Sequence, residues 1–142
     1  MSLSWAIHRI NGISSPANAM YNADELSHQL KTSGCKALFT VTSLLPVARK
    51  AAKAAGIPEY RIYICDMAGQ NPAPSGYTTL SQLVARGMSL PELEPIDWAK
   101  GQGSRQTAFL CYSSGTSGLP KAVMISHRNV IGKSFPQTIL LP

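Results

Sequence analysis

Two short apolar runs on either side of an alanine-rich segment constrain the fold of this chain more than any other feature. The runs are 36–41, Lys-Ala-Leu-Phe-Thr-Val, and 61–65, Arg-Ile-Tyr-Ile-Cys. Between them Ser43 is a candidate helix cap, Pro46 suits a first helical turn, and Gly56 is a stop signal after an Ala-rich stretch. A strand, a helix and a strand within about 30 residues form a βαβ unit, whose strands are parallel and whose crossover is right-handed.

The flanking segments extend this α/β pattern. Asn22 can cap a helix with an acidic first turn that stops at Gly34. Residues 67–106 are rich in Gly, Pro, Ser and Gln, and we expect a surface connection with one short helix at 79–86. Beyond it, the patterns predict a strand at 107–112, a short strand at 122–125 and a helix capped by Ser126. The expected fold is α/β in a single domain: a partial parallel sheet flanked by helices.

Composition argues against several classes of function. The chain has 142 residues, 44% hydrophobic and 14% charged, which suits a globular domain with a core. Its 13 Lys and Arg residues are scattered, although the net charge is +6, so we expect no nucleic-acid surface. No segment approaches the roughly 18–20 apolar residues of a membrane span, and we expect an intracellular protein, cytoplasmic or peroxisomal. Cys35, Cys65 and Cys111 are too dispersed for a disulfide framework or a Cys-x-x-Cys metal site.

Residues 112–129 have a composition that packing does not explain. They read Tyr-Ser-Ser-Gly-Thr-Ser-Gly-Leu-Pro-Lys-Ala-Val-Met-Ile-Ser-His-Arg-Asn. Backbone N–H groups, side-chain hydroxyls and one ammonium could converge there on an anion, and a polyphosphate is the anion that needs so many donors. Because Ala122 rather than a hydroxyl residue follows Lys121, the segment is not a Walker A loop. The candidate phosphate-binding residues are Ser113, Ser114, Gly115, Thr116, Ser117, Gly118 and Lys121.

The pattern Ser-Ser-Gly-Thr-Ser-Gly-Leu-Pro-Lys, set between two strands, resembles the nucleotide-phosphate loop of adenylate-forming enzymes. This superfamily comprises acyl-CoA synthetases, luciferases and peptide-synthetase adenylation domains. Upstream stretches at 5–10, 15–18 and 50–56 are similar to 4-coumarate–CoA ligase-like members, especially fungal ones. The resemblance implies that residues 1–142 are part of the family's large N-terminal AMP-binding domain, ending just after the phosphate loop, with no C-terminal domain.

The resemblance also implies a two-step reaction. A carboxylic acid would attack the α-phosphate of ATP, with Mg²⁺, to give an acyl-adenylate and pyrophosphate, and coenzyme A would then displace AMP. The loop residues would line the β- and γ-phosphates, with Lys121 adding positive charge as pyrophosphate departs. Two positions differ from the family's usual pattern: Ala122 stands where Gly is common, and Thr116-Ser117 where Thr-Thr is common.

Other segments of such enzymes have no counterpart here, namely those that stack adenine, bind ribose and supply the C-terminal-domain lysine. We therefore expect a truncated member that does not complete the reaction alone, and we assign no catalytic residue and no metal ligand. His127 is expected to be structural or solvent-facing, and His8 gives no functional signal. Three alternatives to a ligase segment remain: a non-catalytic nucleotide-binding module, an interaction module that self-associates through an exposed sheet edge, or a non-functional remnant.

Overall fold

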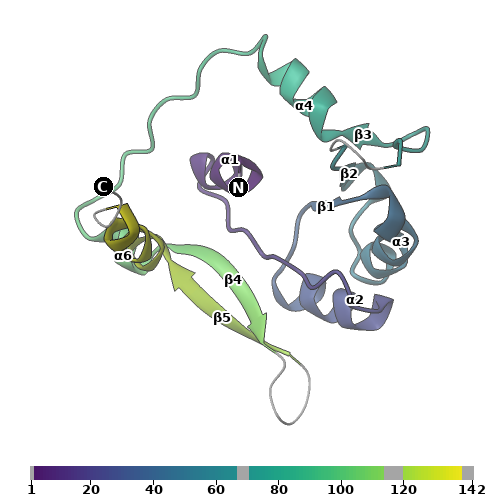
Figure 1. Cartoon of the computed structure of the whole chain (residues 1–142), viewed down its shortest axis with the longest axis horizontal. Coiled ribbons are helices and arrows are strands. Elements are labelled where there is room, and N and C mark those ends of the chain that lie inside the picture. The colour runs from purple at the N-terminus through teal and green to yellow at the C-terminus, as the bar shows by residue number, and fades with distance from the viewer. Residues whose placement is uncertain (1, 67–70, 114–119, 139–142) are drawn as a thin grey trace. The chain divides into compact units, whose positions relative to one another are not determined.

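The computed structural model describes residues 2–66, 71–113 and 120–138 (Figure 1). The chain divides into two compact units. One, the parallel-sheet unit, consists of Asn18–Leu93; the other, the hairpin unit, consists of Met1–Ala17 and Glu94–Pro142. In the part of the chain that the structure describes, no helix is both long enough and apolar enough to cross a membrane.

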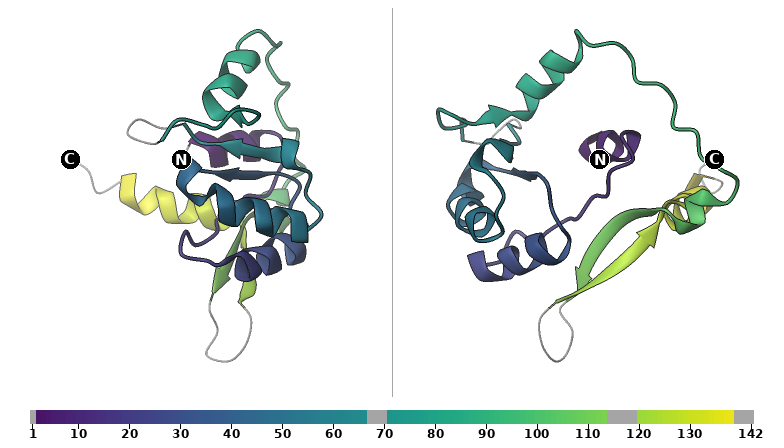
Figure 2. Two further views of the ribbon diagram at one scale, coloured as in Figure 1. Left: turned by 90° about the vertical axis from the view of Figure 1, so that its right-hand side faces the viewer. Right: turned by 180° about the vertical axis from the view of Figure 1, so that it is seen from behind.

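The parallel-sheet unit contains the predicted βαβ arrangement. Strand β1 (Leu38–Thr40) pairs in parallel with β2 (Ile62–Ile64), and α3 (Leu45–Ala54) connects them. Figure 2 shows α3 lying across one face of this sheet, beside α2 (Ala23–Thr32). The expectation for residues 67–106 was incomplete, because β3 (Thr78–Thr79) adds a third parallel strand beside β2. A two-residue strand has too few residues to give an alternating pattern, so the sequence carried no signal for it.

Helix boundaries in this unit follow local capping chemistry. The Asn22 side chain accepts the Asp24 and Glu25 N–H groups at the start of α2, and the Glu25 carboxylate accepts the Asn22 N–H in return. Helix α4 (Leu80–Gly87), predicted at 79–86, begins with a similar pair formed by Thr79 and Gln82. These reciprocal bonds satisfy N–H groups that have no partner within the helix.

The predicted Ser43 cap of α3 was wrong. Residues Thr42–Leu44 form a 3₁₀ turn, η1, and α3 starts after Leu44 with no side-chain hydrogen bond at its cap. The turn already shapes the entry into the helix, and Pro46 in the first helical turn removes one of the N–H groups that a cap would satisfy. A second 3₁₀ turn, η2 (Glu59–Arg61), leads into β2.

The core of the parallel-sheet unit lies between its helices and the inner face of its sheet. Ile62 and Ile64 alternate along β2 and are 2% and 0% exposed. They pack with residues of α2, α3 and the turn after α3: Leu26, Leu30, Leu45, Ala51, Ala52 and Ile57. Burial of aliphatic side chains on the same face of β2 is the main force that holds this unit together.

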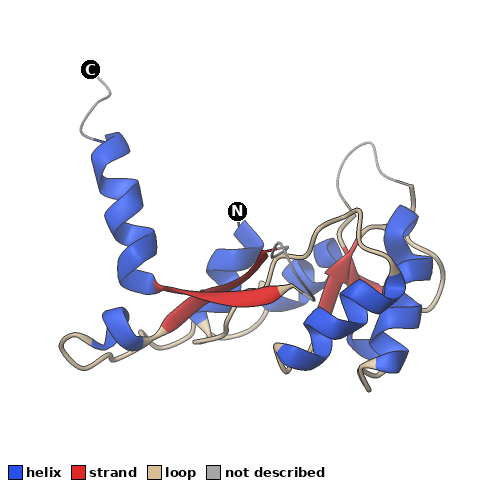
Figure 3. Ribbon diagram, turned by 90° about the horizontal axis from the view of Figure 1, so that it is seen from below, coloured by secondary structure: helices blue, strands red, loops and turns tan. Residues whose placement is uncertain are grey.

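The hairpin unit is built around β4 (Thr107–Ser113) and β5 (Lys121–Ser126). Both strands were predicted, but they pair antiparallel, whereas the sheet of the other unit is parallel. The connection between them is too short for the crossover that parallel strands need. Helix α1 (Ser2–Arg9) precedes the hairpin, α5 (Gln102–Arg105) leads into β4, and β5 passes directly into α6 (His127–Thr138) (Figure 3).

Candidate functional site

The ends of the predicted phosphate loop lie opposite each other at the tip of the β4–β5 hairpin. Ser113 ends β4, Lys121 begins β5, and the two residues are direct partners in the strand register. Opposite residues of an antiparallel pair project to the same face of the sheet, with Cβ atoms about 4.5–5.5 Å apart. The hydroxyl of Ser113 and the ammonium of Lys121 therefore emerge on one face, where both can donate to a single anion.

Five of the seven predicted residues, Ser114, Gly115, Thr116, Ser117 and Gly118, lie outside the described residues. The two that are described, Ser113 and Lys121, are both solvent-exposed. Their donors are a hydroxyl and an ammonium, with no carboxylate in either side chain. This pair suits a phosphate oxygen.

The base of the hairpin is joined to the start of α6. Thr107 pairs with Ser126, and the His127 N–H donates to the Gln106 carbonyl at 3.1 Å. The Asn129 N–H donates to Ser126 Oγ at 3.3 Å, which confirms the predicted Ser126 cap. The strand and the helix that flank the loop on its C-terminal side therefore share one hydrogen-bonded junction.

The outer edge of β4 is bound to the N-terminal segment. The Ser14 N–H donates to the Ala108 carbonyl and the Leu110 N–H to the Ser14 carbonyl, both at 2.9 Å. Ser15 Oγ donates to the Leu110 carbonyl at 3.1 Å, and His8 Nε2 donates to the Ala108 carbonyl at 2.9 Å. Ala108 is fully buried, so the two bonds to its carbonyl are shielded from water. A two-stranded hairpin is only marginally stable by itself, and these bonds supply support from a third segment.

A cluster of aromatic rings covers this base, and sequence reasoning did not find it. His127 contacts His8 with ring centroids 4.9 Å apart and Trp98 with centroids 4.6 Å apart. His8 also contacts Phe109 at 4.8 Å and Trp5 at 5.9 Å. We name these five residues the ring cluster. Because its members come from α1, residue 98, β4 and α6, no local sequence pattern could have indicated it.

Of the two histidines in the ring cluster, His8 is buried and His127 is partly buried. His8 is 7% exposed and His127 is partly buried, which supports the structural alternative among the two expectations for His127. Burial, and then the neighbouring His8, lower the pKa of His127 below its ordinary value. A neutral imidazole is therefore the favoured form of His127 near neutral pH.

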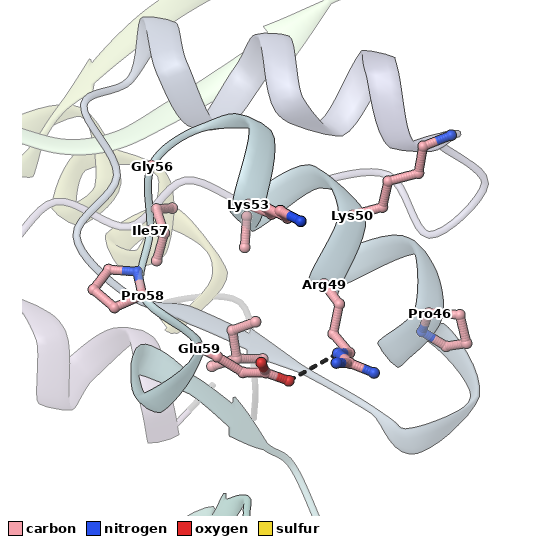
Figure 4. A pocket seen from close by; sticks show the side chains of 10 residues that line it. Pro46, Arg49, Lys50, Lys53, Gly56, Ile57, Pro58 and Glu59 are labelled. Atoms are coloured by element: carbon pink, nitrogen blue, oxygen red, sulfur yellow. Dashed lines mark ion pairs between the residues drawn. The ribbon is translucent and has the colours of Figure 1, made fainter.

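A second candidate feature lies in the parallel-sheet unit, where residues of α3 and the turn after it line a pocket of about 720 Å³ (Figure 4). Its cationic side chains are Arg49, Lys50 and Lys53, and Arg49 pairs with Glu59 at 2.8 Å. The Tyr77 hydroxyl also donates to Glu59, and this bond is the largest of the effects that lower the pKa of the Glu59 carboxyl. The pocket is partly neutralised by Glu59 and holds none of the predicted phosphate-binding residues.

The described residues offer little for other chemistries. No three His, Cys, Asp or Glu side chains among them gather in a way that could hold a metal ion. Cys35, Cys65 and Cys111 are partly buried free thiols. Desolvation raises the pKa of Cys35 and of Cys65, which makes these two poor nucleophiles near neutral pH.

Comparisons with known proteins were made for the sequence and for the fold. Residues 2–137 match the family described as AMP-binding enzyme. An acyl-CoA ligase of Cordyceps militaris is 38% identical over 136 residues, which cover 91% of this chain and 21% of that protein. An acyl-CoA ligase of Alternaria alternata is 39% identical over 132 residues, which cover 92% of this chain and 22% of that protein. The chain thus spans about a fifth of the length of these curated relatives.

Solved structures show the same fold. A red-emitting luciferase from Phrixothrix hirtus aligns with a TM-score of 0.71 at 25% identity, covering 88% of this chain and 29% of the luciferase. A long-chain-fatty-acid–CoA ligase from Archaeoglobus fulgidus aligns with a TM-score of 0.70 at 22% identity, covering 96% of this chain and 24% of that chain. The predicted α/β fold and the resemblance to adenylate-forming enzymes are both confirmed. Since the family match extends over nearly all of its length, the chain belongs to the AMP-binding enzyme family.

Proposed function

We propose that this chain supplies the ATP-phosphate-binding segment of an AMP-forming carboxylic acid–CoA ligase. The family match and the relatives named acyl-CoA ligases support the reaction class. The observation that carries the proposal is the pairing of Ser113 with Lys121, which closes the hydroxyl- and glycine-rich loop at one hairpin tip. Because ATP and coenzyme A are metabolites of the cell interior, we propose an intracellular location, in the cytoplasm or in peroxisomes.

The residues of the segment have distinct parts in this scheme. Backbone N–H groups and hydroxyls of Ser113, Ser114, Gly115, Thr116, Ser117 and Gly118 bind oxygens of the β- and γ-phosphates. Lys121 places a positive charge where negative charge accumulates as the acid carboxylate attacks the α-phosphorus and the bond to pyrophosphate breaks. Coenzyme A then supplies the thiol that displaces AMP, and no described residue is assigned to it.

The hydrogen-bond donors of the site favour one ligand, a polyphosphate, over another, Mg²⁺. Hydroxyl and ammonium groups fit a polyphosphate, whereas Mg²⁺ prefers carboxylate and carbonyl oxygens. Ser113 and Lys121 supply no carboxylate, so Mg²⁺ would be held mainly by the ATP phosphates.

Calorimetric titration with ATP and Mg²⁺ tests the binding part of the proposal. Lys121→Ala removes a charge-assisted hydrogen bond worth about 1.5–3 kcal/mol, so the affinity for ATP should fall roughly 10- to 150-fold. Lys133→Ala is the matched control, because it removes the same charge from an exposed position on α6 of the same unit. Equal affinities of the two variants would place ATP somewhere other than the hairpin tip.

The chain spans only about a fifth of its curated relatives, and we propose that it does not complete the ligase reaction alone. Pyrophosphate exchange with ATP and a panel of aromatic and fatty acids measures the first half-reaction directly. The chain by itself should bind ATP without exchanging pyrophosphate. Exchange by the isolated chain with any acid would contradict this part of the proposal.

A second candidate function is an interaction module, and the outer strand of the hairpin favours it. Among the described residues, β5 pairs with β4 alone. Its Val123 and Met124 side chains are 52% and 73% exposed. An unpaired strand edge with exposed apolar side chains is a template for pairing with another chain. Self-association measured by light scattering, and abolished by Val123→Lys, would favour this function.

A further inference from the structure

The ring cluster contains polar atoms that packing leaves without partners. Within the described chain, His8 Nδ1, Trp98 Nε1 and His127 Nε2 are buried and have no hydrogen-bond partner. All three atoms belong to rings that contact one another directly, with His127 between His8 and Trp98. Buried polar atoms are normally satisfied, so three exceptions in one cluster call for an explanation.

The tautomer of His8 follows from its single hydrogen bond. A carbonyl oxygen only accepts, so His8 Nε2, 2.9 Å from the Ala108 oxygen, carries the hydrogen. In a neutral ring His8 Nδ1 is then an unprotonated acceptor.

Two features of the ring cluster oppose protonation of His127: a missing hydrogen-bond acceptor and repulsion from His8. A charged imidazole donates from both nitrogens, and His127 Nε2 has no acceptor. His8 is the titratable group that acts on His127, and two charged rings with centroids 4.9 Å apart would repel each other. The other ring in contact, that of Trp98, is uncharged.

The charged side chains of the neighbouring elements do not compensate. On α1, Arg9 donates to the Glu94 carbonyl at 2.7 Å, and on α5 the Arg105 guanidinium lies over Gly101. Both are cations, as is the exposed Arg128 next to His127, and none of them would stabilise a protonated histidine. Asp97, the carboxylate next to Trp98, is solvent-exposed, so water screens its charge. On the β4 side, the ring that His8 meets is the uncharged Phe109.

We propose that His8 and His127 are positioning residues that hold the phosphate-binding hairpin in register only while the His127 ring is neutral. The inference rests on the proposed function and deepens it. The His8 ring donates to the Ala108 carbonyl of β4, and the backbone N–H of His127 donates to the Gln106 carbonyl just before β4. Separation of the two rings would displace the residues that make these bonds, at the base of a hairpin whose opposite end carries Ser113 and Lys121.

The direction of the pH effect follows from His127. Its pKa in the folded chain is lowered from 6.5, so the unfolded chain binds the proton more readily. The stability of the cluster is complete above pH 6.5 and is lost progressively as pH falls below that value. Phosphate binding at the hairpin should fail over the same range.

The test measures ATP–Mg²⁺ affinity of the whole chain by calorimetry between pH 8 and pH 5.5. Over this pH range the ATP affinity of wild type should fall roughly tenfold more than that of His127→Phe. This variant keeps an aromatic ring but cannot be protonated. Protonation of ATP itself affects both proteins equally, so the difference isolates the protein. His28→Gln, which removes a histidine from the other unit, should follow wild type. His8→Gln, which keeps a donor for Ala108, should still lose affinity as pH falls, because His127 can still be protonated.

Hydrogen exchange of the Leu110 amide provides a readout that does not need ATP. Its protection, which depends on the bond to the Ser14 carbonyl, should fall below pH 6.5 in wild type relative to His127→Phe. If wild type binds no ATP at pH 8, the proposed function fails. The pH dependence of Leu110 amide protection still tests whether the histidines hold the hairpin. Identical pH profiles of wild type and His127→Phe would overturn the inference.

Discussion

Gly56→Ala tests how the parallel-sheet unit ends its central helix. The Ile57 N–H donates to the Ala52 carbonyl at 2.9 Å and the Gly56 N–H to the Lys53 carbonyl at 3.2 Å. This pair of bonds is a Schellman motif, and it requires the left-handed conformation that Gly56 has, with φ of 73°. The motif also carries Ile57 into the core against α3.

The expected cost is a backbone effect alone. A Cβ built on Gly56 meets no atom within 4 Å, so steric collision adds nothing. Left-handed geometry costs an L-residue about 1–2 kcal/mol, and replacing glycine recovers about 0.4–1 kcal/mol through the unfolded chain. Gly56→Ala should therefore lower the free energy of unfolding by up to about 1.6 kcal/mol.

Thermal and urea denaturation followed by circular dichroism measure this change. Each kcal/mol should shift Tm by about 4–8 °C for a small unit. Gly87→Ala is the matched control, since Gly87 is helical without positive φ and a Cβ there also meets nothing within 4 Å. It should raise stability by up to about 1 kcal/mol. Shifts of the same sign for both substitutions would refute the assignment of a left-handed helix end at Gly56.

Three further changes test other contacts. Ile64→Ala should lower the unfolding free energy by about 2–5 kcal/mol in urea denaturation, because Ile64 is completely buried on the central strand. Asn22→Ala removes both cap bonds of α2 and should cost about 0.5–2 kcal/mol in the same assay. Tyr77→Phe should raise the pKa of Glu59 in an NMR titration, since the Tyr77 hydroxyl is the largest cause of its lowering. The stability that Glu59 contributes is present above pH 4.5 and is lost as pH falls, so wild type and Tyr77→Phe should converge in acid.

Much of the parallel-sheet unit was predictable because its helices begin and end at residues whose effect is local. Asn22, Gly34 and Gly56 act through hydrogen bonds to residues at most five positions away, and each was located correctly. The wrong or missing predictions arose where the sequence pattern was weak or was typical of more than one structure. Ser43 has the chemistry of a cap, but the 3₁₀ turn before α3 took its place. Strand β3 depends on pairing with β2, and two residues are too few to show the alternating hydrophobic pattern that would predict a strand.

In the candidate site, too, the features set by neighbouring residues could be predicted, and those set by tertiary contacts could not. The donors of the loop are contiguous in the chain, so their chemistry could be recognised from residues 113–121 alone. Their opposition across the hairpin depends on strand pairing, which the structure supplies at Ser113 and Lys121. The ring cluster was beyond sequence reasoning, because His8 and His127 are joined only through tertiary contact.

ATP affinity at the loop should depend on how firmly the hairpin is supported along its outer side. A hairpin with two strands gains little stability from its own pairing, and β4 is held on its outer side by Ser14, Ser15 and His8. A fluctuating hairpin would offer the same donors to ATP but would lose entropy on binding that an ordered one has already lost. Ser14→Pro removes one N–H that supports β4 without altering any proposed ligand of phosphate, so it should weaken ATP binding while Ser2→Pro should not. Equal ATP affinities of the two proline variants would mean that the loop is ordered by its own sequence and not by the segment beside it.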